Sequence, residues 1–308
     1  LAALEFIQDQ QAIIDGNLKS IEDTTGGQLQ LAVAKFPGTD STAAVLKPSS
    51  KQKKLVVPFD ESLPSGDFTI EAYVQLHSLY EDATVRTIAA HWDSNTSNPG
   101  WALGVTSKKS KYTPGNLILQ LVGRTGSGQL KYEVIPSDIH LELNQPYYVA
   151  ASVKVDDTSE KGVNVDDTSE QGVTFYVKKP LGEDELQTAN VKHEVVRSYR
   201  PDYALNLGGR HNSTRHFWDG LIDSVRLSDR VLPQDSLLVN ASSGVDSVVG
   251  DWHFDGEAKD AIADRSPEKN DISLNLSNMD KPASPPSTSA LVDFCHVLLN
   301  SNEFLYVD

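Results

Sequence analysis

The stretch Phe68-Thr-Ile-Glu-Ala-Tyr-Val-Gln-Leu76 has an apolar residue at every second position. Successive side chains of a β-strand point to opposite faces, so a period of two places these residues on one face. That face consists of Phe68, Ile70, Ala72, Val74 and Leu76. The pattern predicts a half-buried strand.

Similar short runs follow along the chain, separated by loops rich in Gly, Ser, Asn, Asp and Pro. Many short strands without helices between them indicate an antiparallel sandwich or barrel. We therefore predict an all-β domain over residues 28–276. The runs span residues 87–92, 101–105, 116–123, 129–135, 147–155, 173–179, 204–209 and 217–228.

The two ends of the chain have a helical pattern instead. Residues 1–23 carry apolar residues at alternating steps of three and four, which predicts an amphipathic helix in a connector of residues 1–27. Residues 281–289 are rich in Pro and Ser, and residues 290–308 return to helical spacing. We therefore expect a linker and a C-terminal helix over residues 277–308.

Composition and charge limit the function classes. The chain has 308 residues, 39% of them hydrophobic and 23% charged, which is typical of a soluble globular protein, and no apolar run is long enough for a membrane span. The net charge of -16 argues against nucleic acid as a partner, because a phosphate backbone needs a clustered positive field. A single cysteine, Cys295, excludes an intrachain disulfide. The start at Leu1, without Met or a signal-peptide pattern, suggests a fragment or a processed piece.

A near-repeat of ten residues joins two predicted strands. Its copies are Val155-Asp-Asp-Thr-Ser-Glu-Lys-Gly-Val163 and Val165-Asp-Asp-Thr-Ser-Glu-Gln-Gly-Val173. The carboxylates allow two interpretations: a calcium loop, or a solvated loop extension of the kind that surfaces tolerate cheaply. The copies do not match the EF-hand pattern.

Two further stretches carry a family resemblance. Gly66-Asp-Phe-Thr-Ile-Glu-Ala-Tyr-Val74 is similar to the "dFTieaWv" strand of the laminin-G-like jelly-roll family, and Phe217-Trp-Asp-Gly-Leu-Ile-Asp-Ser-Val-Arg-Leu227 is similar to its closing strand. Trp101-Ala-Leu-Gly and Ala204-Leu-Asn-Leu-Gly-Gly occur where the family has middle strands. The resemblance implies a concanavalin A-like antiparallel jelly-roll β-sandwich.

The first strand of the family pattern occurs in an unusual place. The family begins with a "W.FD" strand, which here follows the closing strand as Asp251-Trp-His-Phe-Asp-Gly256, with Asp264-Arg-Ser-Pro-Glu-Lys-Asn-Asp271 after it. We interpret this order as a circular permutation, which is easy when the termini of a domain lie close together. The alternative is a truncated second repeat.

The tail from Ala290 to Asp308 resembles the C-terminal end of large planctomycete proteins that combine a cytochrome-c-like domain with a jelly-roll insert. This resemblance implies an extracytoplasmic location, as in an exported protein, and other domains of a parent protein as partners. It also implies that any haem belongs to a domain outside this chain.

Calcium is the metal that the resemblance suggests, since calcium prefers carboxylate and carbonyl oxygens. In jelly-roll relatives an Asp of the closing strand, here Asp223, joins an acidic residue of the first strand, here Asp255. Asp264 is a further candidate from the next loop. The alternative is that Asp223 is a satisfied carboxylate at the end of a sheet.

Carbohydrates are bound by aromatic rings that stack on sugars and by planar polar side chains that hold hydroxyl groups. This mixture predicts a ligand site at Trp92, Asp93, Trp101, Arg210, His211 and Trp218. These residues converge only if their strands share the concave sheet face, which should then be an open groove with exposed Trp. A face filled by loops would argue against a lectin, and each Trp could instead belong to the core.

Three functions compete at this point. We expect a non-catalytic carbohydrate-binding module, with a structural or protein-interaction domain as the alternative. A glycoside hydrolase or lyase is disfavoured, because hydrolysis needs two carboxyl groups about 5 to 10 Å apart and the chain has no ExDxxE string. The sequence also has no HExxH, GxSxG or P-loop motif.

Overall fold

The computed structural model describes residues 31–47, 53–80, 83–155, 172–181, 184–197, 201–211, 213, 215–240, 245–255 and 261–276. The predicted helical segments, residues 1–27 and 277–308, lie outside the described residues. So does most of the near-repeat, residues 156–171. These three predictions therefore stay predictions.

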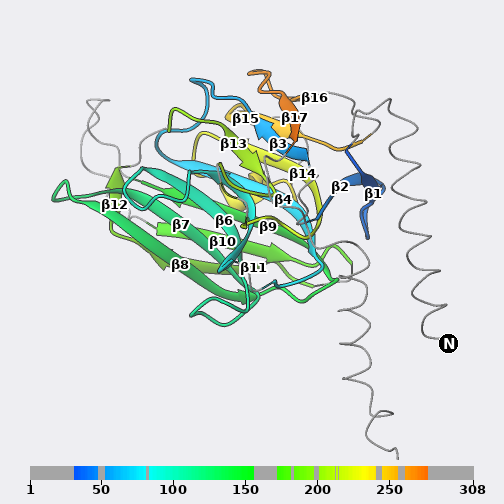
Figure 1. The fold of residues 1–308 in the computed structure, drawn as a ribbon, viewed down its shortest axis with the longest axis horizontal. Helices are drawn as coiled ribbons and strands as arrows, with labels where there is room; N and C mark the ends of the chain where they lie inside the picture. The colour runs from blue at the N-terminus through cyan, green and yellow to red at the C-terminus, as the bar shows by residue number, and fades with distance from the viewer. Residues whose placement is uncertain are drawn as a thin grey trace, which may run out of the picture. The chain divides into compact units, whose positions relative to one another are not determined.

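The described strands form two sheets, and all of their pairings are antiparallel (Figure 1). Within the described residues, the eight-stranded sheet has the order β1 (Val33–Lys35), β2 (Thr42–Leu46), β14 (Gly220–Ser228), β4 (Phe68–Leu76), β9 (Pro146–Lys154), β10 (Gly172–Lys178) and β11 (Gln187–Lys192), with β15 (Val248–Trp252) also paired to β14. The nine-stranded sheet has the order β12 (Val195–Arg197), β7 (Asn116–Thr125), β6 (Gly100–Thr106), β5 (Val85–His91), β13 (Leu205–Leu207), β3 (Lys53–Val57), β17 (Ile272–Leu276) and β16 (Ala261–Ile262), with β8 (Leu130–His140) also paired to β7. The predicted antiparallel jelly-roll β-sandwich is confirmed.

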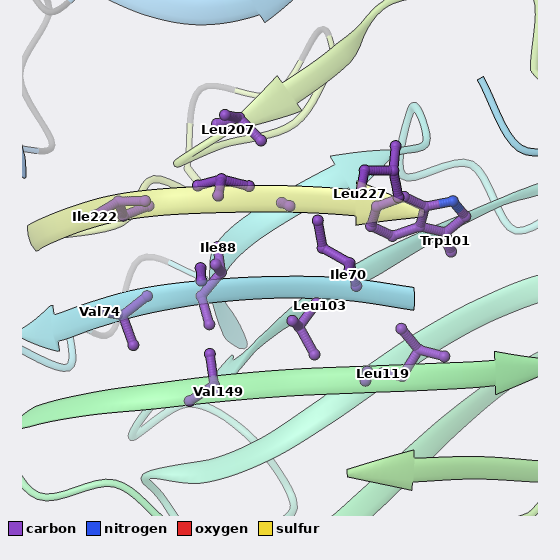
Figure 2. Close-up of a cluster of buried hydrophobic side chains, with 14 of the residues drawn as sticks. Ile70, Val74, Ile88, Trp101, Leu103, Leu119, Val149, Leu207, Ile222 and Leu227 are labelled. Atoms are coloured by element: carbon purple, nitrogen blue, oxygen red, sulfur yellow. The ribbon is translucent and has the colours of Figure 1, made fainter. Parts of the chain in front are cut away.

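The core contains the inward-facing side chains of both sheets (Figure 2). The eight-stranded sheet contributes Ile70, Val74, Val149 and Ile222, and the nine-stranded sheet contributes Ile88, Leu103 and Leu119. The ring of Phe68 stacks on that of Trp101, with centroids 4.6 Å apart. Each large apolar side chain buried in this way stabilises the fold by roughly 1.5 to 3 kcal/mol. The period of two in Phe68–Leu76 thus marks the inward face of β4 correctly.

Strand β14 occupies a central position because it pairs with β4 on one side and with β2 and β15 on the other. It begins at Gly220, whose φ of +144° suits glycine, and a Cβ there would overlap the carbonyl oxygen of Gln75. A register shift between Asp223 and Arg226 bends the strand. The glycine of the closing motif is therefore a backbone requirement.

The C-terminal strands belong to the same sandwich. β15 pairs with β14, and β17 pairs with β3. An isolated bridge between Trp252 and Asp264 holds the loop that follows β15. The segment predicted from Asp251-Trp-His-Phe-Asp thus completes this sandwich rather than starting a second one, although the permuted order itself stays a prediction.

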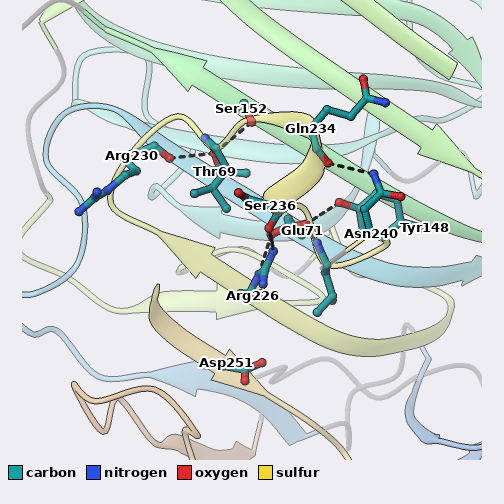
Figure 3. A network of polar contacts seen from close by, with 12 residues as sticks. Thr69, Glu71, Tyr148, Ser152, Arg226, Arg230, Gln234, Ser236, Asn240 and Asp251 are labelled. Carbon is teal, nitrogen blue, oxygen red and sulfur yellow. Dashed lines mark hydrogen bonds and ion pairs between the residues drawn. The ribbon is translucent and has the colours of Figure 1, made fainter. Parts of the chain in front are cut away.

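The outward face of β4 is also buried, which the alternating pattern does not predict. Glu71, which is fully buried, pairs with Arg226 of β14, whose Nη2 lies 2.7 Å from Glu71 Oε1 (Figure 3). The hydroxyl of Tyr148 donates to Glu71 Oε2 at 2.5 Å, and the backbone N–H of Leu238 donates to the same oxygen at 2.6 Å. Burial raises the pKa of Glu71, and the charge of Arg226 opposes that rise.

Residues 229–240 cover this face and include the short 3-10 helix η1 (Gln234–Ser236). The guanidinium of Arg226 donates to the carbonyl of Ser236 at 2.7 Å. The hydroxyl of Thr69 donates to the carbonyl of Arg230 at 2.8 Å and accepts from the N–H of Leu232 at 3.0 Å. Thr69 and Glu71 of β4 therefore hold a returning segment rather than face solvent.

We expect Arg226→Met to lower the free energy of unfolding by about 3 to 5 kcal/mol, because it leaves the Glu71 carboxylate buried without its partner. Urea unfolding followed by Trp fluorescence measures the change. Glu71→Gln combined with Arg226→Met should recover much of the loss, whereas Arg230→Gln, which alters an exposed arginine, should be neutral. A loss below about 1 kcal/mol in Arg226→Met would contradict this role.

Candidate functional site

Arg210 lies on the face of the nine-stranded sheet that is turned away from the core. Its Nε donates to the hydroxyl of Thr87 in β5 at 2.8 Å, and its Nη2 donates to Gln120 Oε1 in β7. The guanidinium also lies over the ring of Trp92, with Cζ 5.3 Å from the ring centroid. Only 2% of Arg210 is exposed. Burial lowers the pKa of Arg210 to about 9, so it is still a cation at neutral pH.

An aromatic layer continues this contact across the sheet. The rings of Trp92 and Tyr132 stack with centroids 5.7 Å apart, and the side-chain amide of Gln120 donates to the Tyr132 hydroxyl at 2.5 Å. Thr87, Ala90 and Ala102 beneath them are fully buried. This part of the sheet face is therefore filled, and not the open groove with exposed Trp that the lectin hypothesis predicted.

The loop between β5 and β6 forms a polar rim beside this layer. The carboxylate of Asp93 accepts from the backbone N–H of Asn95 at 2.9 Å and from the side-chain amide of Asn98 at 2.6 Å. The indole N–H of Trp92 donates to the carbonyl of Asn95 at 3.0 Å. These bonds shape the loop so that Asp93 and Asn98 stay partly exposed.

Tyr203 and His211 form a stacked pair at the same rim. Their ring centroids are 4.9 Å apart with an interplanar angle of 15°, and both residues are partly exposed. The Tyr203 hydroxyl accepts from the backbone N–H of Asp93 at 3.3 Å and donates to the carbonyl of Pro99 at 3.2 Å. Burial, together with the charge of Asp93, raises the pKa of Tyr203 to about 12. A half-exposed aromatic pair thus stands next to a carboxylate and an amide.

His216 lies in the loop between β13 and β14, among positive charges. Its carbonyl accepts from the backbone N–H of Thr87 at 3.2 Å, and its Nδ1 is 2.7 Å from the hydroxyl of Ser213. Burial, together with the positive charges of Arg210, Arg86 and Arg215, lowers the pKa of His216 to about 3. The imidazole is therefore neutral at physiological pH.

The predicted ligand residues divide into two groups. Trp92, Asp93, Arg210 and His211 come together at the rim and the filled face described above. Trp101 lies in the core, and the indole N–H of the fully buried Trp218 donates to the carbonyl of Leu221 at 3.1 Å. Trp101 and Trp218 therefore offer no surface on which a sugar could stack, because their rings pack in the sandwich interior.

Sequence reasoning missed Tyr203, Asn98 and Tyr132 as parts of this region. Tyr203 directly precedes the Ala204-Leu-Asn-Leu-Gly-Gly motif, and that position is the one signal that could have indicated it. Asn98 and Tyr132 gain their neighbours only through the pairing of β5, β6, β7 and β8.

The predicted metal residues lie on the other sheet. Asp223 of β14 is fully buried; its Oδ2 accepts from the hydroxyl of Ser41, and its Oδ1 has no hydrogen-bond partner among the described residues. Burial raises the pKa of Asp223, and the charge of Asp255 adds to the rise. Asp255 accepts from the backbone N–H of Thr42 at 3.0 Å. These two carboxylates are therefore neighbours.

Asp264 has a different environment. Its Oδ1 accepts from the backbone N–H groups of Asp251 at 2.7 Å and Ser266 at 2.8 Å. Its Oδ2 accepts from the hydroxyl of Ser266 at 2.6 Å and the N–H of Asn270 at 2.8 Å. Four bonds occupy this carboxylate, which organises its own loop. In the part of the chain that the structure describes, no group of three or more His, Cys, Asp or Glu side chains could hold a metal ion.

The fold defines the class of protein as an antiparallel β-sandwich with loop sites at its ends. Residues 49–237 match the family described as the Concanavalin A-like lectin/glucanases superfamily, in its laminin G form. The chain belongs to this superfamily. No curated protein matches the chain.

Solved structures with a similar fold come from varied sources. Tailspike protein 2 of Escherichia coli O157:H7 bacteriophage CAB120 is 12% identical, with a TM-score of 0.48 over 74% of this chain and 28% of its own length. The SAP-like pentraxin of Limulus polyphemus is 16% identical, with a TM-score of 0.41 over 74% of this chain and 91% of its own. The Ruminococcus gnavus IT-sialidase CBM40, bound to α2,3 sialyllactose, is 15% identical, with a TM-score of 0.38 over 63% of this chain and 96% of its own. The chain thus spans less than a third of the tailspike protein.

Across the described residues, none of the helices combines the length and apolar character that crossing a membrane requires.

We expect His216→Gln to make the fold more tolerant of acid. The folded pKa of about 3 lies below the ordinary 6.5, so the unfolded chain binds a proton between these values that the folded chain does not. The stability of the fold therefore falls as the pH drops below 6.5, by at most about 1.4 kcal/mol per pH unit from this group.

Urea unfolding at about pH 7.5 and at about pH 5.0 measures this contribution to the free energy of unfolding. The loss of stability between them should be smaller in His216→Gln than in the original chain by about 1 to 2 kcal/mol. His77→Gln, which alters an exposed imidazole, should keep the original loss. Equal losses in all three proteins would show that His216 does not resist protonation.

Proposed function

We propose that the chain is a non-catalytic carbohydrate-binding, lectin-like module. The observation that supports this most directly is the half-exposed Tyr203–His211 stack beside Asp93 and Asn98. Aromatic faces pack against the apolar face of a sugar ring, and each carboxylate or amide oxygen of the rim can accept a further hydrogen bond from a hydroxyl group. Membership of a superfamily that includes lectins is consistent with this function.

The proposed site lies at the loop rim and not across the sheet. Arg210, Trp92 and Tyr132 fill the face over β5, β6 and β7, so a long open groove is not available there. A rim site of this size suits a short glycan or a chain end, and its binding should be weak, because few groups are buried by the ligand.

The alternative is a structural or protein-interaction domain in a multidomain envelope protein. The filled face of the nine-stranded sheet favours it, as does the returning segment that covers β4. A glycoside hydrolase or lyase is the third candidate, since the superfamily also includes glucanases. A glycan array separates the first two functions, and release of reducing ends from a bound polysaccharide would indicate the third.

The setting of the module is also part of the proposal. We infer an extracytoplasmic protein of planctomycete type, in which this sandwich accompanies a cytochrome-c-like domain and other partner domains. The support is the resemblance of residues 290–308, which lie outside the described residues.

We expect Tyr203→Ala to weaken glycan binding by at least about tenfold, because it removes the exposed ring and its support for the Asp93 backbone. His211→Ala should weaken binding by a smaller factor, about threefold, since Tyr203 still offers one face. A glycan array on the full chain identifies the ligand, and isothermal titration then measures affinity.

Tyr112→Ala is the matched control, because Tyr112 is a partly exposed tyrosine in the loop at the opposite end of β6. This variant should bind like the original chain. Binding that survives Tyr203→Ala, or that Tyr112→Ala removes equally, would place the glycan elsewhere.

Calcium binding at Asp223 and Asp255 is a second element of the proposal. The buried Oδ1 of Asp223 lacks a partner among the described residues, and Asp255 and the hydroxyl of Ser41 lie beside it. Oxygen atoms of this kind are the ligands that calcium prefers, and a bound cation would relieve the cost of burying Asp223. Asp223 lies in β14 of the eight-stranded sheet, whereas the rim belongs to the nine-stranded sheet, so calcium there would stabilise the fold without touching the glycan.

We expect about 1 mM CaCl2 to raise the melting temperature of the chain by about 3 °C, because an ion that binds only the folded state stabilises it. The same concentration of MgCl2 should have a smaller effect, since magnesium demands stricter geometry. Asp223→Asn should abolish the calcium response, and Asp229→Asn, which alters an exposed carboxylate, should retain it. A response of equal size in Asp223→Asn would rule this site out.

A further inference from the structure

Arg210 differs from Arg226, the buried arginine of the eight-stranded sheet, in having no acidic partner among the described residues. Arg226 pairs with the Glu71 carboxylate. Arg210 instead donates to Thr87 and Gln120 and, over a longer 3.4 Å, from Nη1 to the hydroxyl of Ser94. These partners and the ring of Trp92 are all neutral. Burying a charge with neutral partners alone costs free energy, and a ligand of opposite charge would offset that cost.

Two more arginines, Arg86 and Arg215, lie near His216, whose pKa they lower together with Arg210. Arg86 directly precedes Thr87, whose hydroxyl accepts from Arg210 and whose backbone N–H donates to the carbonyl of His216. Nη1 of Arg86 donates to the carbonyl of Phe217 at 3.1 Å. Arg215 is exposed and adjoins His216 in the sequence. We call Arg86, Arg210, Arg215 and His216 the arginine cluster. Burial is the main cause of the low pKa of His216, and the charges of the three guanidinium groups lower it as well.

This concentration of positive charge contrasts with the rest of the chain. The protein has 43 acidic and 27 basic residues and a net charge of -16. No carboxylate is among the groups that shift the pKa of Arg210 or His216. A local positive field in an acidic protein attracts anions to one place and repels them elsewhere.

We propose that the arginine cluster binds the anionic group, a carboxylate or a sulfate ester, of an acidic glycan. This inference rests on the proposed carbohydrate-binding function and names the class of sugar. The Tyr203–His211 pair connects the two sites, because His211 follows Arg210 directly and stacks at the rim. A sugar ring on that stack would therefore carry its acidic substituent toward the cluster.

The entry point for the anion is the side of the cluster that reaches the surface. Arg215 is exposed, and Ser94, Ser213 and His216 are partly exposed. The bond from Nη1 of Arg210 to Ser94 is the weakest of its three by distance, so this N–H can turn to an anion at little cost. Arg215 would then provide the first contact from solvent, and Arg210 a charge-assisted bond from beneath.

The test uses the full chain and matched pairs of oligosaccharides measured by isothermal titration. One pair is trigalacturonate and its methyl ester, and the other is a sulfated heparin tetrasaccharide and its desulfated form. We expect the acidic member of at least one pair to bind about tenfold more tightly than its neutral counterpart, which corresponds to ~1.4 kcal/mol. The pair that shows the difference identifies the anion as carboxylate or sulfate. The preference should decrease as NaCl is added.

Arg215→Gln is the main variant, because an exposed side chain can be changed without disturbing the core. It should remove most of the preference for the acidic member and leave binding of the neutral member unchanged. Arg230→Gln, an exposed arginine on the eight-stranded sheet side, is the matched control and should keep the full preference. Equal affinity for both members of both pairs, or an undiminished preference in Arg215→Gln, would overturn the inference and leave the proposed function intact.

A second readout does not depend on any glycan. Inorganic sulfate should raise the pKa of His216, followed by proton NMR of the imidazole, since a bound anion offsets the field of the three arginines. The rise should be lost in Arg215→Gln and kept in Arg230→Gln. If no glycan binds but sulfate still raises the pKa of His216, the anion site stands and the carbohydrate-binding function fails. If sulfate leaves that pKa unchanged, the arginine cluster is not an anion site.

Discussion

The outer faces of strands β4 and β14 are buried where Glu71 and Arg226 lie, so these two charges must neutralise each other. Glu71 and Arg226 do this across the two strands, and neither has water to replace a missing partner. Their remaining donors and acceptors are used by Tyr148 and by the backbone at Ser236 and Leu238. The ion pair thus fixes the path of residues 229–240, and that path in turn delivers the chain to β15.

The fold could be predicted from the sequence because a period of two is a local signal. It placed the inward face of β4 correctly, and the motif around Gly220 indicated the closing strand β14. The burial of Thr69 and Glu71 could not be predicted, because the residues that cover them are distant in sequence and carry no periodic pattern. Short edge strands such as β1, β12 and β16 were missed for a related reason: two or three residues are too few to show alternation.

The candidate site was only partly predictable. Residue type alone suggested Trp92, Asp93, Arg210 and His211, and the pairing of β5 with β13 brings their loops together. Residue type also suggested Trp101 and Trp218, whose large apolar rings serve the core equally well. What separates these cases is which side of a strand a ring occupies, and the register of the sheet decides that. Tyr203 belongs to the site because its hydroxyl contacts the Asp93 loop, and no local sequence motif predicts that contact.

The pairing of β3 has a consequence for how the chain folds. Val56 of β3 pairs with Asn206 of β13 on one side and with Ser273 of β17 on the other. The ribosome makes β13 and β17 long after β3, so both edges of β3 stay unpaired during most of synthesis. Contacts of such high sequence separation fold slowly and leave strand edges open to wrong pairings. A chaperone, or a high rate of synthesis relative to aggregation, would therefore influence the yield of this protein more than its final stability does.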